Sequence, residues 1–129
     1  MKRIAAVLCI LALSIPFEAQ SADDPNIKGE EREGIQKSME SYVKRNSIKK
    51  EYVIYNAVEG KLLWLNYKAL HEGIVKKGEF YVSCADFTDG SDNLYDVDFL
   101  VARKGKNFRV LQALVHSVNG EKRTYHLEK

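Results

Sequence analysis

Asp96 and Asp98 are the residues of this chain whose type and spacing come closest to a site for proton transfer. They lie in the segment 95–99, where apolar and acidic residues alternate. In an extended strand, side chains two positions apart share a face and stand about 7 Å apart. Burying a carboxylate among apolar neighbours is costly unless a partner compensates its charge. The pattern therefore predicts that something pairs with these two carboxylates.

His116 is the imidazole expected to work with them. If a strand over 108–118 returns tightly around Gly105, Asp98 lies opposite Gln112 or a neighbour, and His116 approaches the Asp96 end. An imidazole beside a carboxylate can act as acid or orienter for a general base. Asp96, Asp98 and His116 are therefore the candidate catalytic residues. In the alternative reading both aspartates are solvated and pair with basic side chains, namely Arg109, Lys61 or Lys68.

Metal binding and cofactors are not predicted. Acidic residues crowd the segment 86–96, but their order does not fit a calcium loop and no bidentate glutamate follows at the required place. Asp89 and its neighbours are also typical of a turn. The three histidines, His71, His116 and His126, are too scattered for a zinc signature. We therefore expect no metal ion and no cofactor.

Cys84 is expected to be a buried, small hydrophobic residue, because it alternates with Phe80 and Val82 along one strand face. The other cysteine, Cys9, lies in the N-terminal segment that we expect to be removed, so no internal disulfide is predicted. A single cysteine in an exported protein can also form a bridge between two chains. Assembly of a homodimer through Cys84 or a sheet edge therefore stays open.

Residues 1–22 have the layout of a secretory signal peptide. Lys2 and Arg3 precede an apolar run over 4–17, and small residues lead up to Ala22. The run is shorter than the roughly 20 residues that span a bilayer, so we expect a secreted or periplasmic protein without stable membrane insertion. Loss of Lys2, Arg3 and Glu18 lowers the formal charge from +2 to +1. A nearly neutral exported domain is not expected to bind nucleic acid.

The remaining chain predicts a short disordered arm over 23–27 and a single domain over 28–129. Apolar residues Ile35, Met39, Tyr42 and Val43 form one stripe of an amphipathic helix over about 28–46, whose firm part starts near Gly34. The rest reads as strands joined by short turns, among which Asn119-Gly120 is the clearest hairpin signal. The expected strands are 52–58, 61–71, 79–88, 94–103, 108–118 and a short 124–127.

These elements predict an α+β fold, in which the N-terminal amphipathic helix packs on a curved antiparallel sheet of five to six strands. Short turns rule out parallel crossovers, which need a dozen or more residues each. The order of one helix followed by an antiparallel meander resembles the cystatin-like and nuclear-transport-factor-2-like superfamilies. That resemblance implies a concave sheet face that often forms a pocket. The inhibitory loops of cystatins are missing, since Gln112 is not followed by their valine and glycine.

The leading expectation is an exported small binding or interaction domain that holds an unknown small ligand or protein partner on the concave sheet face. Trp64, Tyr67 and Gln112 are the candidate ligand-binding residues. The alternatives are a small lyase or isomerase using Asp96, Asp98 and His116, and a structural module. Whether the protein is an enzyme is left open, because no nucleophile or phosphate-loop motif is present in the sequence.

Overall fold

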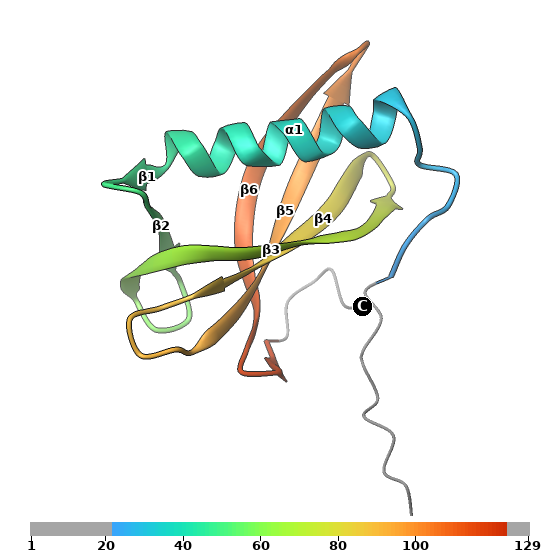
Figure 1. Ribbon diagram of the computed structural model, residues 1–129. Coiled ribbons are helices and arrows are strands. Elements are labelled where there is room, and N and C mark those ends of the chain that lie inside the picture. The colour runs from blue at the N-terminus through green and yellow to red at the C-terminus, as the bar shows by residue number, and fades with distance from the viewer. Residues whose placement is uncertain (1–21, 124–129) are drawn as a thin grey trace, which may run out of the picture.

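The computed structural model describes residues 22–123. The expected signal peptide, apart from Ala22, lies outside the described residues, as do the expected strand 124–127 and His126. The described chain is one helix followed by a seven-stranded antiparallel sheet in strict sequence order (Figure 1). The α+β prediction is therefore confirmed in its class.

The helix, α1, spans Glu30–Arg45, so it begins neither at residue 28 nor at Gly34. Glu30, Glu31 and Glu33 occupy its first turn. Their carboxylates interact favourably with the positive end of the helix dipole. This stabilisation outweighs the poor helix propensity of Gly34. Ile35 and Met39 are buried, as the apolar stripe predicts. Figure 1 shows α1 lying across the sheet, and it packs mainly against β6 and β5.

The sheet is a meander. Its strands are β1 (Ser47–Ile48), β2 (Glu51–Asn56), β3 (Lys61–Lys77), β4 (Phe80–Thr88), β5 (Leu94–Lys104), β6 (Asn107–Val118) and β7 (Glu121–Lys122). The predicted count of five to six strands is wrong, because β1 and β7 have two residues each and too little pattern to read. Asn119 and Gly120 both have positive φ and form the predicted turn between β6 and β7.

The two faces of the sheet differ in what covers them. The helix face packs under α1 and carries the core, in which Phe87, Val97 and Phe99 have no exposed surface. Tyr52 stacks beside Phe87 at 5.1 Å between ring centroids. Residues of opposite parity, such as Cys84 on β4 and Asp98 on β5, lie on the other side, which we call the outer face.

The segment 23–27, expected to be a disordered arm, is instead held against β3. The backbone N–H of Asp24 donates to the Ile74 carbonyl at 2.8 Å, and the Ile74 N–H donates to Asp23 Oδ1 at 3.1 Å. Ile27 is 4% exposed and belongs to the core. Backbone pairing and apolar burial thus order a segment whose composition alone predicts a disordered arm.

Within the described residues, no helix is both long and apolar enough to cross a membrane.

Candidate functional site

Six polar side chains gather on the outer face of the central strands. We call them the polar cluster: His71 of β3, Cys84 and Asp86 of β4, Asp96 and Asp98 of β5, and His116 of β6. The register places Cys84 opposite Asp98 and Asp86 opposite Asp96, so the two middle strands supply four of the six side chains directly. The cluster contains all three of the predicted catalytic residues.

A bulge in β6 places His116 on this face. From the hairpin turn, β5 and β6 pair regularly as far as Val101 and Val110, and then Leu111 is an extra residue. Because side chains alternate, this extra residue changes the face of the β6 side chains that follow it, as far as Val115. His116 is a second extra residue, between the pairs Val97–Val115 and Asp96–Ser117. The expected partner of Asp98, Gln112 or a neighbour, is replaced by Leu114 for the same reason.

His71 reaches the cluster through a larger irregularity in β3. Leu70 pairs with Ala85 and Ile74 pairs with Ser83, so three residues of β3 oppose Cys84 alone. The sequence pattern predicts that this strand ends at His71, because Glu72-Gly73 is typical of a turn. A glycine inside a strand pattern is also the usual mark of a bulge, and that reading would have brought His71 toward the site.

His71 is held by two contacts. Its Nε2 lies 2.9 Å from Asp86 Oδ2, and its Nδ1 lies 2.9 Å from Cys84 Sγ. In the neutral tautomer, Nε2–H donates to the carboxylate and Nδ1 accepts the thiol proton. Burial, and then the carboxylates of Asp96, Asp98 and Asp86, raise the pKa of the Cys84 thiol. Cys84 is therefore a protonated donor rather than an activated thiolate, and its imidazole partner is His71.

His116 lies between the two aspartates of β5. Its Nδ1 is 3.4 Å from Asp98 Oδ2 and 3.6 Å from Asp96 Oδ2. The side chain of Asp98 is 9% exposed, while those of His116 and Asp96 are 22% and 21% exposed. Within residues 22–123, both aspartates thus lie beside His116, the imidazole expected to work with them. The site is sunk into the surface, but solvent still reaches it.

Asp96 connects the two halves of the cluster. Its Oδ1 faces His71 Nδ1 at 3.8 Å, and its Oδ2 faces His116. Oδ1 is buried and accepts no hydrogen bond from the described residues. Burial raises the pKa of Asp96; His71 and His116 oppose this effect, while Asp98 and Asp86 add to it. The cluster thus brings three carboxyl groups together with two imidazoles.

The ligand atoms are spaced as a metal ion would need them. Two groups, His71–Cys84–Asp96 and Asp96–Asp98–His116, each place three donor atoms within 4.8 Å of one another. A tetrahedral ion with bonds of about 2.0–2.3 Å holds its ligand atoms about 3.3–3.8 Å apart. The distances from His116 Nδ1 to the two aspartates fall in this range. The spacing of residues along the chain predicts no metal site. It does not show that donor atoms from four different strands come together on one face.

The calcium-loop residues behave as a turn. Asp89 Oδ1 accepts hydrogen bonds from the backbone N–H groups of Ser91 and Asn93, at 2.8 and 3.0 Å. Its Oδ2 accepts from the Asn93 amide and the Tyr95 hydroxyl. Hydrogen bonds within the turn hold this carboxylate and lower the pKa of Asp89.

The candidate ligand-binding residues are not brought together. Tyr67 pairs with Phe87, whose face is covered by α1, whereas Gln112 pairs with Leu100 on the outer face. Trp64 is 43% exposed and lies between the buried residues Leu63 and Leu65, so it points away from the core. Register therefore puts Tyr67 and Gln112 on opposite sides of the sheet.

A scan against protein-family models and searches of curated proteins and of solved structures found no match to this chain.

Proposed function

We propose that this protein is a small exported binding domain whose ligand is a divalent transition-metal ion, held by Asp96, Asp98 and His116 on the outer face of the sheet. The observation that carries the proposal is the position of His116 Nδ1, at 3.4 and 3.6 Å from two carboxylates of a single strand. One imidazole and two carboxylates are a ligand set that Zn²⁺ and its neighbours accept.

The charge of the cluster supports the same conclusion. Three carboxylates lie on one half-buried patch, and the buried Oδ1 of Asp96 accepts no hydrogen bond from the described chain. Carboxylates crowded on one patch repel one another, and a divalent cation would offset that repulsion. Exposure of about one-fifth for Asp96 and His116 lets an ion enter from solvent and leaves room for an additional, non-protein ligand.

His71, Cys84 and Asp86 have a supporting role in this proposal. His71 already uses both ring nitrogens, on Asp86 and on Cys84. The raised pKa of the Cys84 thiol disfavours the thiolate that a metal ion requires. These three residues therefore form a hydrogen-bond network beside Asp96 that fixes its position. Such outer partners usually contribute about 10–100-fold to metal affinity.

The second candidate is the lyase or isomerase, with His116 and Asp98 as an acid–base pair. Their 3.4 Å separation favours it. Catalysis would also need a substrate pocket at these side chains, and neither of the two clefts found near the β5–β6 hairpin is lined by a cluster residue. Metal binding needs no such pocket, so the geometry supports it better.

The export and the cystatin-like resemblance are parts of the same proposal. The order of residues 1–22 supports export, and the order of helix and meander supports the resemblance.

A homodimer through the half-buried Cys84 would require the thiol to leave His71. A purely monomeric band for the exported protein on a non-reducing gel would contradict the disulfide-linked form.

Titration of the mature chain with Zn²⁺ by calorimetry tests the function. We expect one saturable site, and its loss in the His116→Gln variant. Titration with Co²⁺ then identifies the ligands, because a coordinated thiolate gives an intense near-ultraviolet charge-transfer band. We expect the visible bands of bound cobalt without that thiolate band. No saturable binding of either ion would overturn the proposal.

A further inference from the structure

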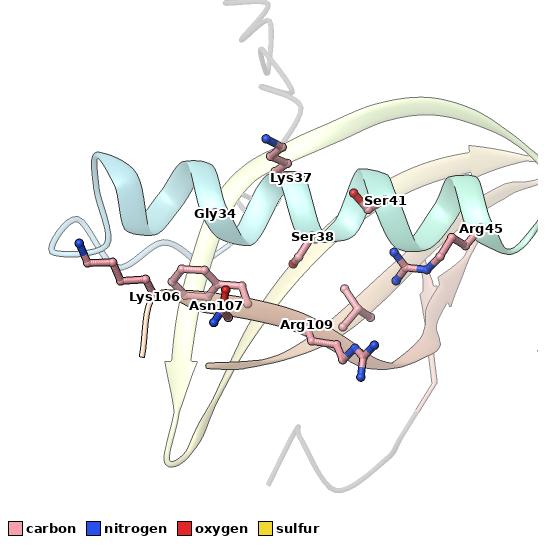
Figure 2. A pocket seen from close by; sticks show the side chains of 10 residues that line it. Gly34, Lys37, Ser38, Ser41, Arg45, Lys106, Asn107 and Arg109 are labelled. Carbon is pink, nitrogen blue, oxygen red and sulfur yellow. The ribbon is translucent and has the colours of Figure 1, made fainter. Parts of the chain in front are cut away.

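A second feature of the surface is a cleft of about 450 Å³ between α1 and the start of β6 (Figure 2). Its lining residues are Gly34, Lys37, Ser38, Ser41, Arg45, Lys106, Asn107, Phe108, Arg109 and Val110. Four of them are basic and none is acidic. The lining of this cleft is therefore positively charged, although the chain as a whole is nearly neutral.

The four basic side chains have no acidic partner among the described residues. Other arginines of the protein do: Arg32 pairs with Asp23, Arg103 with Glu31, and Arg123 with Glu59. Lys37, Arg45, Lys106 and Arg109, by contrast, take part in no ion pair within 22–123 and are all exposed. Four like charges around one cleft repel one another, and a bound anion would relieve that repulsion.

The charges are spaced along a line rather than around a point. Lys37, Ser41 and Arg45 follow one another at intervals of four residues, so they form one stripe that rises about 12 Å along α1. On the other side, Lys106 lies in the turn before β6, and Arg109 lies three residues further along the chain, in β6. This span exceeds the reach of one small anion and suits an extended molecule with repeated anionic groups.

The cleft offers hydrogen bonds but no stacking surface. Ser41 and Asn107 supply a hydroxyl and an amide beside the charges. The aromatic residue of the cleft, Phe108, is packed on three sides: its Cδ2 would lie 2.6 Å from a Cβ at Gly34, Tyr81 packs edge-on at 6.1 Å, and the Arg103 guanidinium covers it at 5.3 Å. Proteins that bind single-stranded nucleic acid combine basic grooves with free aromatic faces, so the cleft favours a non-aromatic polyanion.

We propose that this cleft binds a segment of an anionic polysaccharide, with Lys37, Arg45, Lys106 and Arg109 contacting sulfate, phosphate or carboxylate groups along the chain. Arginine pairs with such groups in a bidentate manner, and Ser41 and Asn107 meet sugar hydroxyls between them. This assignment is independent of the metal proposal, because no residue is shared between the two sites.

The probe is a fully sulfated linear hexasaccharide, titrated into the mature protein in buffer of low ionic strength and followed by calorimetry. The Lys37→Glu/Arg109→Glu variant is the test, since both side chains are exposed and their replacement leaves the core intact. We expect binding to fall by about 10–100-fold, because two favourable contacts become repulsive.

The Lys28→Glu/Lys68→Glu variant is the matched control. It changes the net charge by the same amount at two exposed lysines outside the cleft, and we expect binding close to wild type. If both variants lose the same hexasaccharide affinity, the effect comes from net charge alone and the proposed site is wrong. Equal or tighter binding of a single-stranded oligonucleotide would overturn the polysaccharide assignment, and so would the absence of hexasaccharide binding. Equal binding of inorganic phosphate alone would contradict the extended span.

Discussion

Replacing Asp96 by asparagine should abolish metal-dependent stabilisation without weakening the metal-free protein. Asp96 supplies an oxygen to both groups of donor atoms in the polar cluster. Asparagine keeps the shape and removes the charge. In the metal-free state, burial raises the pKa of Asp96, and the ionised form at neutral pH is then a cost to folding. This cost is absent at pH values below the pKa of the unfolded chain and appears as the pH rises through the higher pKa of the folded protein.

The two states of the protein therefore respond in opposite directions. Without metal, removing one of three crowded carboxylates should leave the free energy of unfolding unchanged or raise it, within about 1 kcal/mol. With Zn²⁺ at about 100 times its Kd, the wild type should gain about 2.7 kcal/mol. For a domain of this size that corresponds to a rise in Tm of about 10–20 °C.

The variant should lose most of this gain. Outer-shell changes alone reduce metal affinity about 10–100-fold, so loss of a direct ligand should cost at least about 100-fold. At the same zinc concentration the stabilisation then falls to about 0.4 kcal/mol, or about 2–3 °C. The assay is thermal unfolding followed by circular dichroism, with zinc or with EDTA. Asp92→Asn is the control, because Asp92 is exposed and has a positive φ that asparagine tolerates.

Two outcomes would refute the reasoning. If Asp96→Asn retains the full zinc shift of the Asp92→Asn control, Asp96 is not a ligand. If Asp96→Asn destabilises the EDTA-treated protein by several kcal/mol, the carboxylate is a structural partner of His71 and His116, and the cluster is a charge network that needs no ion.

The remaining predictions concern the thiol and the packing of α1. Cys84 in the metal-free native protein should react with iodoacetamide at pH 8 at least about 100-fold more slowly than in urea, because burial and three carboxylates raise the pKa of its thiol. Mass spectrometry gives the two reaction rates. Equal rates would contradict the burial of Sγ against His71. Gly34→Ala should lower the free energy of unfolding by about 1–3 kcal/mol despite the better helix propensity of alanine, because the new Cβ would meet the Phe108 ring at 2.6 Å. Urea unfolding measures this change. A stabilised variant would show that Phe108 moves aside freely. Tyr81→Phe should cost about 1 kcal/mol in the same assay, because it removes the hydroxyl that donates to Glu31 Oε1 at 2.5 Å; no loss would mean that water replaces this contact at no cost.

The class of fold could be predicted from the sequence because local signals determine it. The stripe of Ile35 and Met39 predicts the helix, and the short turns exclude a parallel sheet. The strand count could not be predicted, since the two-residue strands β1 and β7 depend on pairing with their neighbours. Residues 23–27 are ordered by contacts with Ile74, which is far away in the sequence.

The site could be predicted only in part. Alternation in β5 correctly places Asp96 and Asp98 on one face, and their pairing with His116 follows once the register is known. That register depends on extra residues at Leu111 and His116 in β6 and on three residues of β3 that oppose Cys84. Gly73 is the one sequence signal for the irregularity in β3, and it is equally typical of a turn. The extra residue Leu111 also moves Gln112 away from the face of Tyr67.

Anomalous diffraction from crystals of the protein soaked in Zn²⁺, recorded at the zinc absorption edge, is the decisive test of the proposed metal site. We expect one strong peak on the outer face, within about 2.0–2.3 Å of His116 Nδ1 and of an oxygen from each of Asp96 and Asp98. A peak bonded to other residues, or no peak at the polar cluster in zinc-saturated crystals, would contradict it.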